Sequence, residues 1–143
     1  MRLKTKNGKE YIFDLVRKKY VRNHPEEWVR QNIVEYLHKE KGYPLSLMSI
    51  EKKTQINHLP KRCDIICYGT DGHPILLVEC KAPNIKLNTD SFHQSINYQK
   101  VVQAKYIVIT NGATHYCFKF KNTKIEFLKN IPHYLNNKSN FND

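Results

Sequence analysis

The sequence predicts an α/β fold: a mixed β-sheet flanked by helices, in the order α-β-β-β-α-β, followed by extra C-terminal strands. Three observations predict it. A helical pattern opens with Pro25 and two acids, as helix starts commonly do. Two apolar segments flank the turn dipeptide Asp71-Gly72, which is typical of a hairpin. The apolar run at 106–110 is typical of a buried strand.

Length and charge limit the classes of protein that the chain can represent. Its 143 residues suit one domain with a core of its own. The 24 Lys and Arg outnumber the 13 acids, for a net charge of +11, which favours a polyanionic partner such as nucleic acid. The alternative is that the charge serves solubility alone. No apolar stretch approaches the ~18 residues of a membrane span, so we expect a cytoplasmic protein with no membrane partner.

The domain organisation follows from changes in composition along the chain. Residues 1–22 are predicted to form a basic arm whose apolar group, Tyr11 to Val16, packs on the domain. Residues 23–130 would form the domain itself, and residues 131–143 a polar tail.

The first helix is predicted from Pro25 to Lys41, with Gly42 just past its end. Its core-facing stripe would be Val29, Ile33, Tyr36 and Leu37. On a helical wheel Glu26 falls within this stripe, whereas Glu27 is turned about a quarter of the way round. An acid on a buried face needs a partner or a function. The alternative is that both acids simply complement the helix dipole.

Further elements follow the same kinds of signal. Asn88 is a candidate cap for the second helix, and Asn111-Gly112 turns the chain between two strands. The second helix is predicted at Thr89–Gln103, and strands at Ser49–Ile56, Arg62–Tyr68, Ile75–Lys81, Tyr106–Thr110, Tyr116–Phe120 and Ile125–Leu128.

The hairpin register identifies a candidate site. A hairpin centred on Asp71-Gly72 sets Asp64 opposite Glu79, at a distance where like charges are destabilising unless something compensates them. A divalent cation would compensate them. Lys81, two residues beyond Glu79, points to the same side of the sheet. The alternative is an ordinary cross-strand salt bridge, but Glu79 ends a strand that is apolar on both faces, where an unpaired acid is costly.

This combination suits metal-assisted hydrolysis of phosphodiesters. Carboxylates bind hard cations such as Mg²⁺, which usually takes one or two of them and keeps several waters. Mn²⁺ can substitute. The ion would activate water and neutralise charge on the phosphate. Lys81 would orient that water or hold a phosphate oxygen.

Two further groups of residues carry weaker signals. Gln94 and Tyr98 lie four residues apart on one helix face, where they could position DNA or simply pack. The four cysteines, Cys63, Cys67, Cys80 and Cys117, form no Cys-x-x-Cys pair and are interpreted as buried reduced thiols rather than a zinc site.

These motifs together resemble the PD-(D/E)XK nuclease superfamily, and more narrowly the N-terminal nuclease domain of type I restriction enzyme R subunits. The resemblance spans most of the chain, and these five motifs in the right order are more specific than any one of them. The motifs are PEEWVRQ at 25–31, KRCDI at 61–65, VECKAP at 78–83, QxxxY at 94–98 and VITNG at 108–112.

The resemblance implies a restriction-endonuclease-like fold and a role for each matching residue. Asp64, Glu79 and the main-chain carbonyl of Cys80 would bind Mg²⁺, Lys81 would be the catalytic lysine, and Glu26 the helix acid. Gln94 and Tyr98 would help position the helix against DNA. One departure is Cys63, which stands where the proline that names the superfamily is expected.

The sequence thus predicts an Mg²⁺-dependent endodeoxyribonuclease, with DNA as its partner, as a homodimer or as a subunit of a larger restriction-type assembly. We do not expect a complete R subunit, because the chain has no Walker-type motif and no room for a helicase motor. One alternative is a noncatalytic nucleic-acid-binding module. Another is a protein-binding subunit that uses the apolar part of the N-terminal arm. In the nucleic-acid-binding alternative, phosphate contacts would come from basic side chains such as Lys52, Lys53, Lys61, Arg62 and Lys86.

Overall fold

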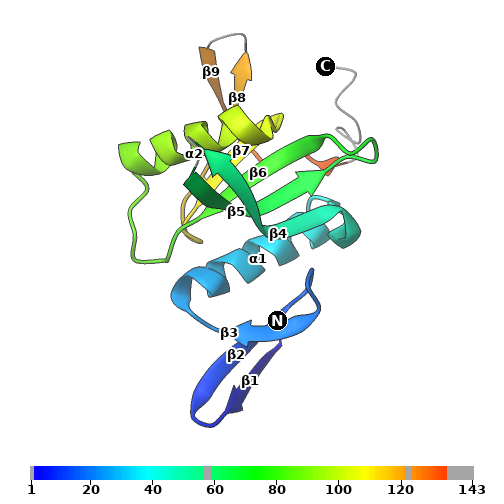
Figure 1. The fold of residues 1–143 in the computed structure, drawn as a ribbon, viewed down its shortest axis with the longest axis vertical. Coiled ribbons are helices and arrows are strands. Elements are labelled where there is room, and N and C mark those ends of the chain that lie inside the picture. The colour runs from blue at the N-terminus through cyan, green and yellow to red at the C-terminus, as the bar shows by residue number, and fades with distance from the viewer. Residues whose placement is uncertain (1, 57–58, 122–123, 135–143) are drawn as a thin grey trace.

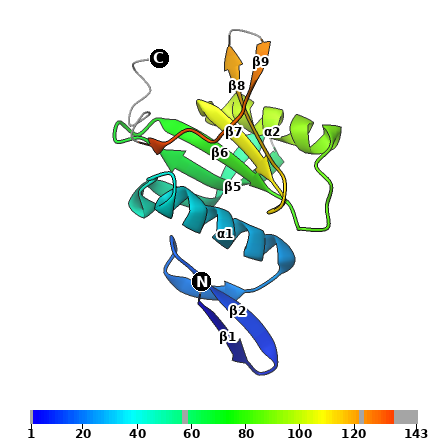
Figure 2. The same ribbon diagram turned by 180° about the vertical axis from the view of Figure 1, so that it is seen from behind.

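The fold is layered, and the computed structural model describes residues 2–56, 59–121 and 124–134. For residues 52–56, 59–63, Tyr98 and Lys121 it describes the backbone alone. Within the described residues a six-stranded sheet lies between two helices, and a small three-stranded sheet lies on the far side of the first helix (Figures 1 and 2). The predicted α/β fold with a mixed sheet is confirmed.

The large sheet has the strand order β4-β5-β6-β7-β8-β9. Only β6 and β7 run parallel among its described pairs, and α2 forms the crossover between them. The elements are α1 (Pro25–Lys39), η1 (Leu45–Leu47), β4 (Met48–Ile56), β5 (Leu59–Tyr68), β6 (Pro74–Cys80), α2 (Thr89–Val102), β7 (Tyr106–Thr110), β8 (His115–Lys121) and β9 (Lys124–Leu128).

Both faces of the central strands are buried, which explains their continuous apolar sequences. Leu76 and Val78 of β6 pack with Val29 and other α1 residues on one face. On the other face Leu77 packs with Ala104, which follows α2. The N-cap of α2 is as predicted: the Asn88 side chain accepts hydrogen bonds from two backbone N–H groups in the first turn of the helix.

The N-terminal segment is a small sheet and not the predicted arm. It comprises β1 (Leu3–Lys6), β2 (Lys9–Asp14) and β3 (Lys19–Arg22), all antiparallel. Asn7 and Gly8 both have positive φ, 52° and 74°, as the tight turn of a two-residue hairpin requires. The segment does pack on the rest of the protein, since Ile12 is fully buried.

Helix α1 is buried over a wider arc than the wheel predicted. Val29, Ile33 and Leu37 are buried as expected, but Tyr36 is 42% exposed, so its place in the core stripe was wrong. Gln31, on another side of the helix, is buried and hydrogen-bonds the N–H of Leu15 in the segment after β2. The small sheet therefore covers a side of α1 that a single core-facing stripe leaves to solvent.

The predicted polar tail at 131–143 was wrong in its first part. Ile131 and Tyr134 are buried in the main core. The Tyr43 hydroxyl donates to the Pro132 carbonyl at 2.8 Å, and the Tyr134 N–H donates to the Lys41 carbonyl at 2.8 Å. Residues 135–143 lie outside the described residues.

In the described part of the chain, neither helix combines the length and the apolar character that crossing a bilayer requires. The cytoplasmic location inferred from the sequence stays a prediction.

We expect Tyr43→Phe to lower the free energy of unfolding by about 1 kcal/mol, because the Pro132 carbonyl loses its donor while the packing of the ring is kept. Urea denaturation measures this. The matched control is Tyr36→Phe, on the exposed side of α1, which should leave stability unchanged. Equal stability of Tyr43→Phe and the unsubstituted protein would show that the 131–134 segment is not held by this hydrogen bond.

Candidate active site

The β5–β6 hairpin has the predicted register. Ile65 pairs with Val78 and Ile66 with Leu77, so continuing the ladder by one residue sets Asp64 opposite Glu79. The turn is longer than predicted: a bulge at Tyr68 shifts the register, and the loop is closed by a hydrogen bond from the Gly69 N–H to the His73 carbonyl. The Asp71-Gly72 dipeptide lies within this loop, where Gly72 has a φ of +85°.

Asp64 is buried, and each of its carboxylate oxygens accepts a hydrogen bond. Oδ1 accepts from Arg30 Nη2 and Oδ2 from the Cys80 backbone N–H, both at 2.8 Å. The second bond joins β5 to the end of β6. Asp64 is thus fixed in place by one charged and one backbone donor.

Glu79 is more deeply buried than Asp64, at 3% exposure against 8%. Its Oε1 lies 3.2 Å from Lys81 Nζ, whereas its Oε2 is buried and has no hydrogen-bond partner among the described residues. Burial, and then the negative charge of Asp64, raise the pKa of Glu79 to about 8. An orphaned carboxylate oxygen of this kind is the group that a cation would satisfy.

Lys81 connects the hairpin to the second helix. Its Nζ donates to Gln94 Oε1 at 2.7 Å while it pairs with Glu79. The sequence predicts Lys81 as the catalytic lysine and Gln94 as a DNA-positioning residue, and the structure brings the two side chains into contact. The side chains of Tyr98, Lys61 and Arg62 lie outside what the structure describes.

The burial predicted for the two acids of α1 was wrong. Glu26 is half exposed, and Glu27 is buried. Glu27 Oε1 lies 2.6 Å from Arg30 Nη1, and its Oε2 accepts from Gln31 Nε2 at 3.0 Å. The wheel failed because it allowed α1 one buried face, whereas the small sheet covers a second one.

Glu26 nevertheless lies beside the hairpin residues. Its Oε1 is 3.6 Å from Arg30 Nη2. Partial burial, and then the charge of Asp64, raise its pKa, and the charge of Lys81 acts in the opposite direction. The structure thus gathers Glu26, Asp64, Glu79 and Lys81 at one place.

Arg30 lies at the centre of the site, and sequence reasoning missed it. It is 6% exposed and contacts four acids: Glu26, Glu27, Glu51 and Asp64. The signal was present, because Arg30 falls on the same side of the helical wheel as Leu37. A buried Arg requires acidic partners.

Glu51 is a second residue that sequence reasoning missed. It belongs to β4, where its φ of 52° is unusual for a residue with a side chain. On either side of it, Ile50 pairs with Ile65 and Lys52 with Cys63 of β5. Its Oε1 lies 3.0 Å from Arg30 Nη1. Strained backbone of this kind often accompanies functional sites.

The site extends to the segment that follows β2. Arg17 Nε pairs with the fully buried Asp14 at 2.7 Å, and its Nη2 lies 3.9 Å from both Glu27 and Glu51. The charged cluster of the described residues therefore holds six acids and three cations. These are Asp14, Glu26, Glu27, Glu51, Asp64 and Glu79, with Arg17, Arg30 and Lys81.

Such an acidic excess inside a chain of net charge +11 favours a bound cation. Within the described ranges, however, no three His, Cys, Asp or Glu side chains converge as a metal site. A cation here would use few protein ligands.

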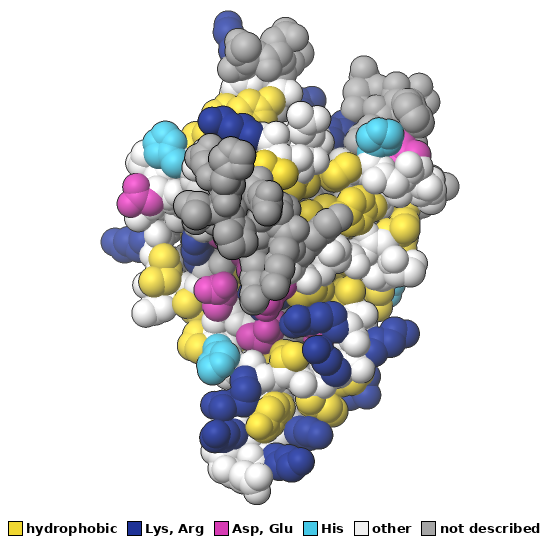
Figure 3. All heavy atoms as spheres, in the orientation of Figure 1, with side chains coloured by type: hydrophobic (Ala, Val, Ile, Leu, Met, Phe, Trp, Pro, Cys, Tyr) yellow, Lys and Arg dark blue, Asp and Glu magenta, His cyan; other side chains and the backbone are white. Residues whose placement is uncertain are grey.

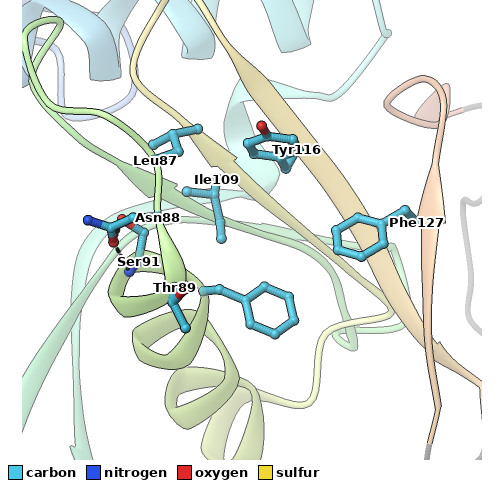
Figure 4. A pocket seen from close by; sticks show the side chains of 8 residues that line it. Leu87, Asn88, Thr89, Ser91, Ile109, Tyr116 and Phe127 are labelled. Carbon is cyan, nitrogen blue, oxygen red and sulfur yellow. Dashed lines mark hydrogen bonds between the residues drawn. The ribbon is translucent and has the colours of Figure 1, made fainter.

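A separate pocket of about 420 Å³ lies between the start of α2 and strands β7 to β9 (Figure 4). Apolar and aromatic side chains dominate its lining, among them Phe92, Ile109 and Phe127. Asn88 at its edge is engaged as the helix cap. Among the described residues its lining holds no carboxylate and no lysine.

The cysteines match the prediction where they are described. Cys67, Cys80 and Cys117 are free and buried, and burial raises the pKa of the Cys117 thiol to about 12. They are therefore protonated and unsuited to nucleophilic chemistry. The side chain of Cys63 lies outside the described residues.

Comparison with known proteins finds a matching family and a similar solved structure. Residues 25–132 match the family described as type I restriction enzyme R protein N terminus. Among solved structures, the fold is similar to a fragment of a putative HsdR subunit of a type I restriction enzyme from Vibrio vulnificus, with a TM-score of 0.57 and 20% identity. That match covers 76% of this chain and 23% of the other. No curated protein matches.

We expect Arg30→Met to lower the free energy of unfolding by about 3–5 kcal/mol, because Glu27 and Asp64 would keep buried charges without their partner. Denaturant titration at neutral pH measures this. Lys39→Met is the control: it removes an exposed pair with Glu35 and should cost less than about 1 kcal/mol. If both variants lose the same small amount, Arg30 does not hold the site together.

The raised pKa of Glu79 predicts a pH dependence. Between its ordinary pKa of 4.5 and about 8, the unfolded chain has released a proton that the folded chain keeps, so folding is disfavoured as pH rises. In metal-free buffer, the stability difference between the unsubstituted protein and Glu79→Gln should therefore fall across this window, by roughly 1 kcal/mol per pH unit. A difference that stays constant from pH 5 to 8 would contradict the assigned burial.

Proposed function

Because the chain belongs to the family of type I restriction enzyme R protein N termini, we propose that it is a metal-dependent DNA endonuclease domain of the PD-(D/E)XK superfamily. One observation carries the proposal: Glu79 is a buried carboxylate with an orphaned oxygen, beside Lys81 and opposite Asp64. Buried carboxylate oxygens without a partner are uncommon in proteins, and a bound ion is one way to satisfy them.

The residues present fit a divalent cation. Glu79, Asp64 and the main-chain carbonyl of Cys80 would hold Mg²⁺ or Mn²⁺, since oxygen ligands suit both ions. The bound ion would lower the pKa of a water and neutralise charge on the phosphate. The raised pKa of Glu79 means that its proton competes with the cation, so binding should strengthen as pH rises.

The other side chains have roles that follow from their contacts. Lys81 would hold a phosphate oxygen or orient the attacking water, and Gln94 keeps the ammonium group directed at the site. Arg30 fixes the orientation of Asp64. Glu26, half exposed at the rim, is placed to accept a proton from water.

A second candidate function is a noncatalytic nucleic-acid-binding module of the same fold. It is favoured by the absence, among described residues, of three convergent metal-binding side chains, and by the two donors that already occupy Asp64. In either case we propose that the protein acts as a subunit of a larger restriction-type assembly. The solved relative is a fragment of a putative R subunit, of which this chain covers 23%. A homodimer stays a prediction.

We expect Glu79→Gln and Asp64→Asn each to reduce metal-dependent DNA cleavage by at least about 100-fold, because each removes a charged metal ligand. Supercoiled plasmid, linear duplex and single-stranded DNA with Mg²⁺ or Mn²⁺ are the substrates. Glu126→Gln, an exposed acid on β9, is the matched control and should cut normally.

Binding of Mn²⁺ in the absence of DNA, measured by calorimetry, gives a second readout that does not depend on cleavage. The unsubstituted protein should bind the ion, and Glu79→Gln should not. If no DNA form is cut and no ion binds, the enzymatic proposal fails and the noncatalytic module stands.

A further inference from the structure

The small N-terminal sheet has one face on which every charge is positive. The strand register places Lys4, Tyr11 and Arg22 in one row across the three strands, with Lys6 beside Lys9 in the next. Arg2 lies beside Phe13 at the other end. We call this the basic face; its cations are Arg2, Lys4, Lys6, Lys9 and Arg22.

The opposite face carries the acids and turns inward. Because side chains alternate along a strand, Glu10, Ile12 and Asp14 of β2 lie on the side away from Tyr11. Ile12 and Asp14 are fully buried, whereas the five cations are exposed. No carboxylate pairs with Lys4, Lys6, Lys9 or Arg22 in the part of the chain that the structure describes.

Aromatic rings hold three of the cations in place. The Arg2 guanidinium lies 3.7 Å from the centre of the Phe13 ring, and Lys4 Nζ lies 4.2 Å from that of Tyr20. Arg22 lies 5.8 Å from Tyr11. Because the cations already lie over these rings, the rings serve to fix the charges rather than to stack on bases. Fixed charges without base contacts suit phosphate groups.

The basic face and the charged cluster belong to connected parts of the molecule. Arg17, in the segment between β2 and β3, reaches Glu27 and Glu51, and the Leu15 N–H bonds Gln31 of α1. Figure 3 shows dark blue side chains gathered over the small sheet, with acids just above them. The acidic cluster repels phosphates, so attraction for DNA must come from another surface.

We propose that the basic face binds the phosphate backbone of duplex DNA and holds it near the candidate site. The inference rests on the proposed function, and it concerns residues outside the family match, which begins at residue 25. Binding here needs no metal, has little sequence preference and weakens steeply with salt.

The outer lysines give the sharpest test. Arg2 and Phe13 also line a cavity against α1, whereas Lys4, Lys6 and Lys9 are exposed. The variant Lys4→Gln/Lys6→Gln/Lys9→Gln is compared with Lys100→Gln/Lys124→Gln/Lys129→Gln, which removes the same charge from exposed lysines on α2, at the start of β9 and just after β9. Fluorescence anisotropy with a labelled 20-base-pair duplex in EDTA gives the affinity across salt concentrations.

The N-terminal variant should bind about 10- to 100-fold more weakly at 0.1 M salt, and the slope of log K against log salt should fall by about 2.7, at 0.9 per phosphate contact. The control should bind as the unsubstituted protein does. Equal weakening of both variants, or of neither, would overturn the proposal. Binding to phosphatidylserine vesicles through the same three lysines, as tight as to DNA, would overturn it too.

Because these measurements are made without metal, they are separate from the proposed catalysis. Loss of cleavage in Glu79→Gln with unchanged DNA binding supports both proposals. If the unsubstituted protein never cuts DNA but binds it through the three lysines, the catalytic proposal fails and the basic face stands.

Discussion

The buried guanidinium of Arg30 is the constraint on which the rest of the structure depends. Its two terminal nitrogens contact acids from α1, β4 and β5, so a single side chain fixes the helix relative to the sheet. A buried cation of this kind is tolerable only when its acids are present, and the acids only when it is. Asp64 thereby acquires one defined orientation. Glu79 is not among the acids that Arg30 contacts, and its Oε2 is buried without a hydrogen-bond partner among the described residues.

Local signals in the sequence were sufficient to predict the strands of the large sheet and the hairpin that carries the site. A hairpin centred on Asp71-Gly72 sets Asp64 opposite Glu79, and the bulge at Tyr68 does not change that pairing. The same reasoning applied to Asn7-Gly8 would have predicted the first hairpin, because Asn-Gly is a strong turn signal. It was missed because strands β1 and β3 carry few apolar residues, so the alternation that identifies a strand is weak.

What the sequence could not supply was the layer on the second side of α1. A helical wheel assumes one buried face, and on that assumption Glu26 belongs inside and Glu27 outside. The small sheet covers the helix from another direction, so Glu27 and Gln31 become buried and bond one another. Arg30 then lies between the two sides of α1 that the large sheet and the small sheet cover. The burial of Glu27 and Gln31 depends on packing between segments distant in sequence, which periodicity alone does not encode.

The distribution of charge would separate the two proposed activities, cation binding and DNA binding, which otherwise conflict. A site that binds a divalent cation needs an excess of carboxylates, and that excess repels the phosphates on which such a cation would act. In this chain the acids face inward around Arg30, and the positive charges of the small sheet face outward. Arg17 lies between the acids around Arg30 and the basic face. It contacts Asp14 of β2 and Glu51 of β4. Attraction for a polyanion and affinity for a cation can therefore coexist within one small domain.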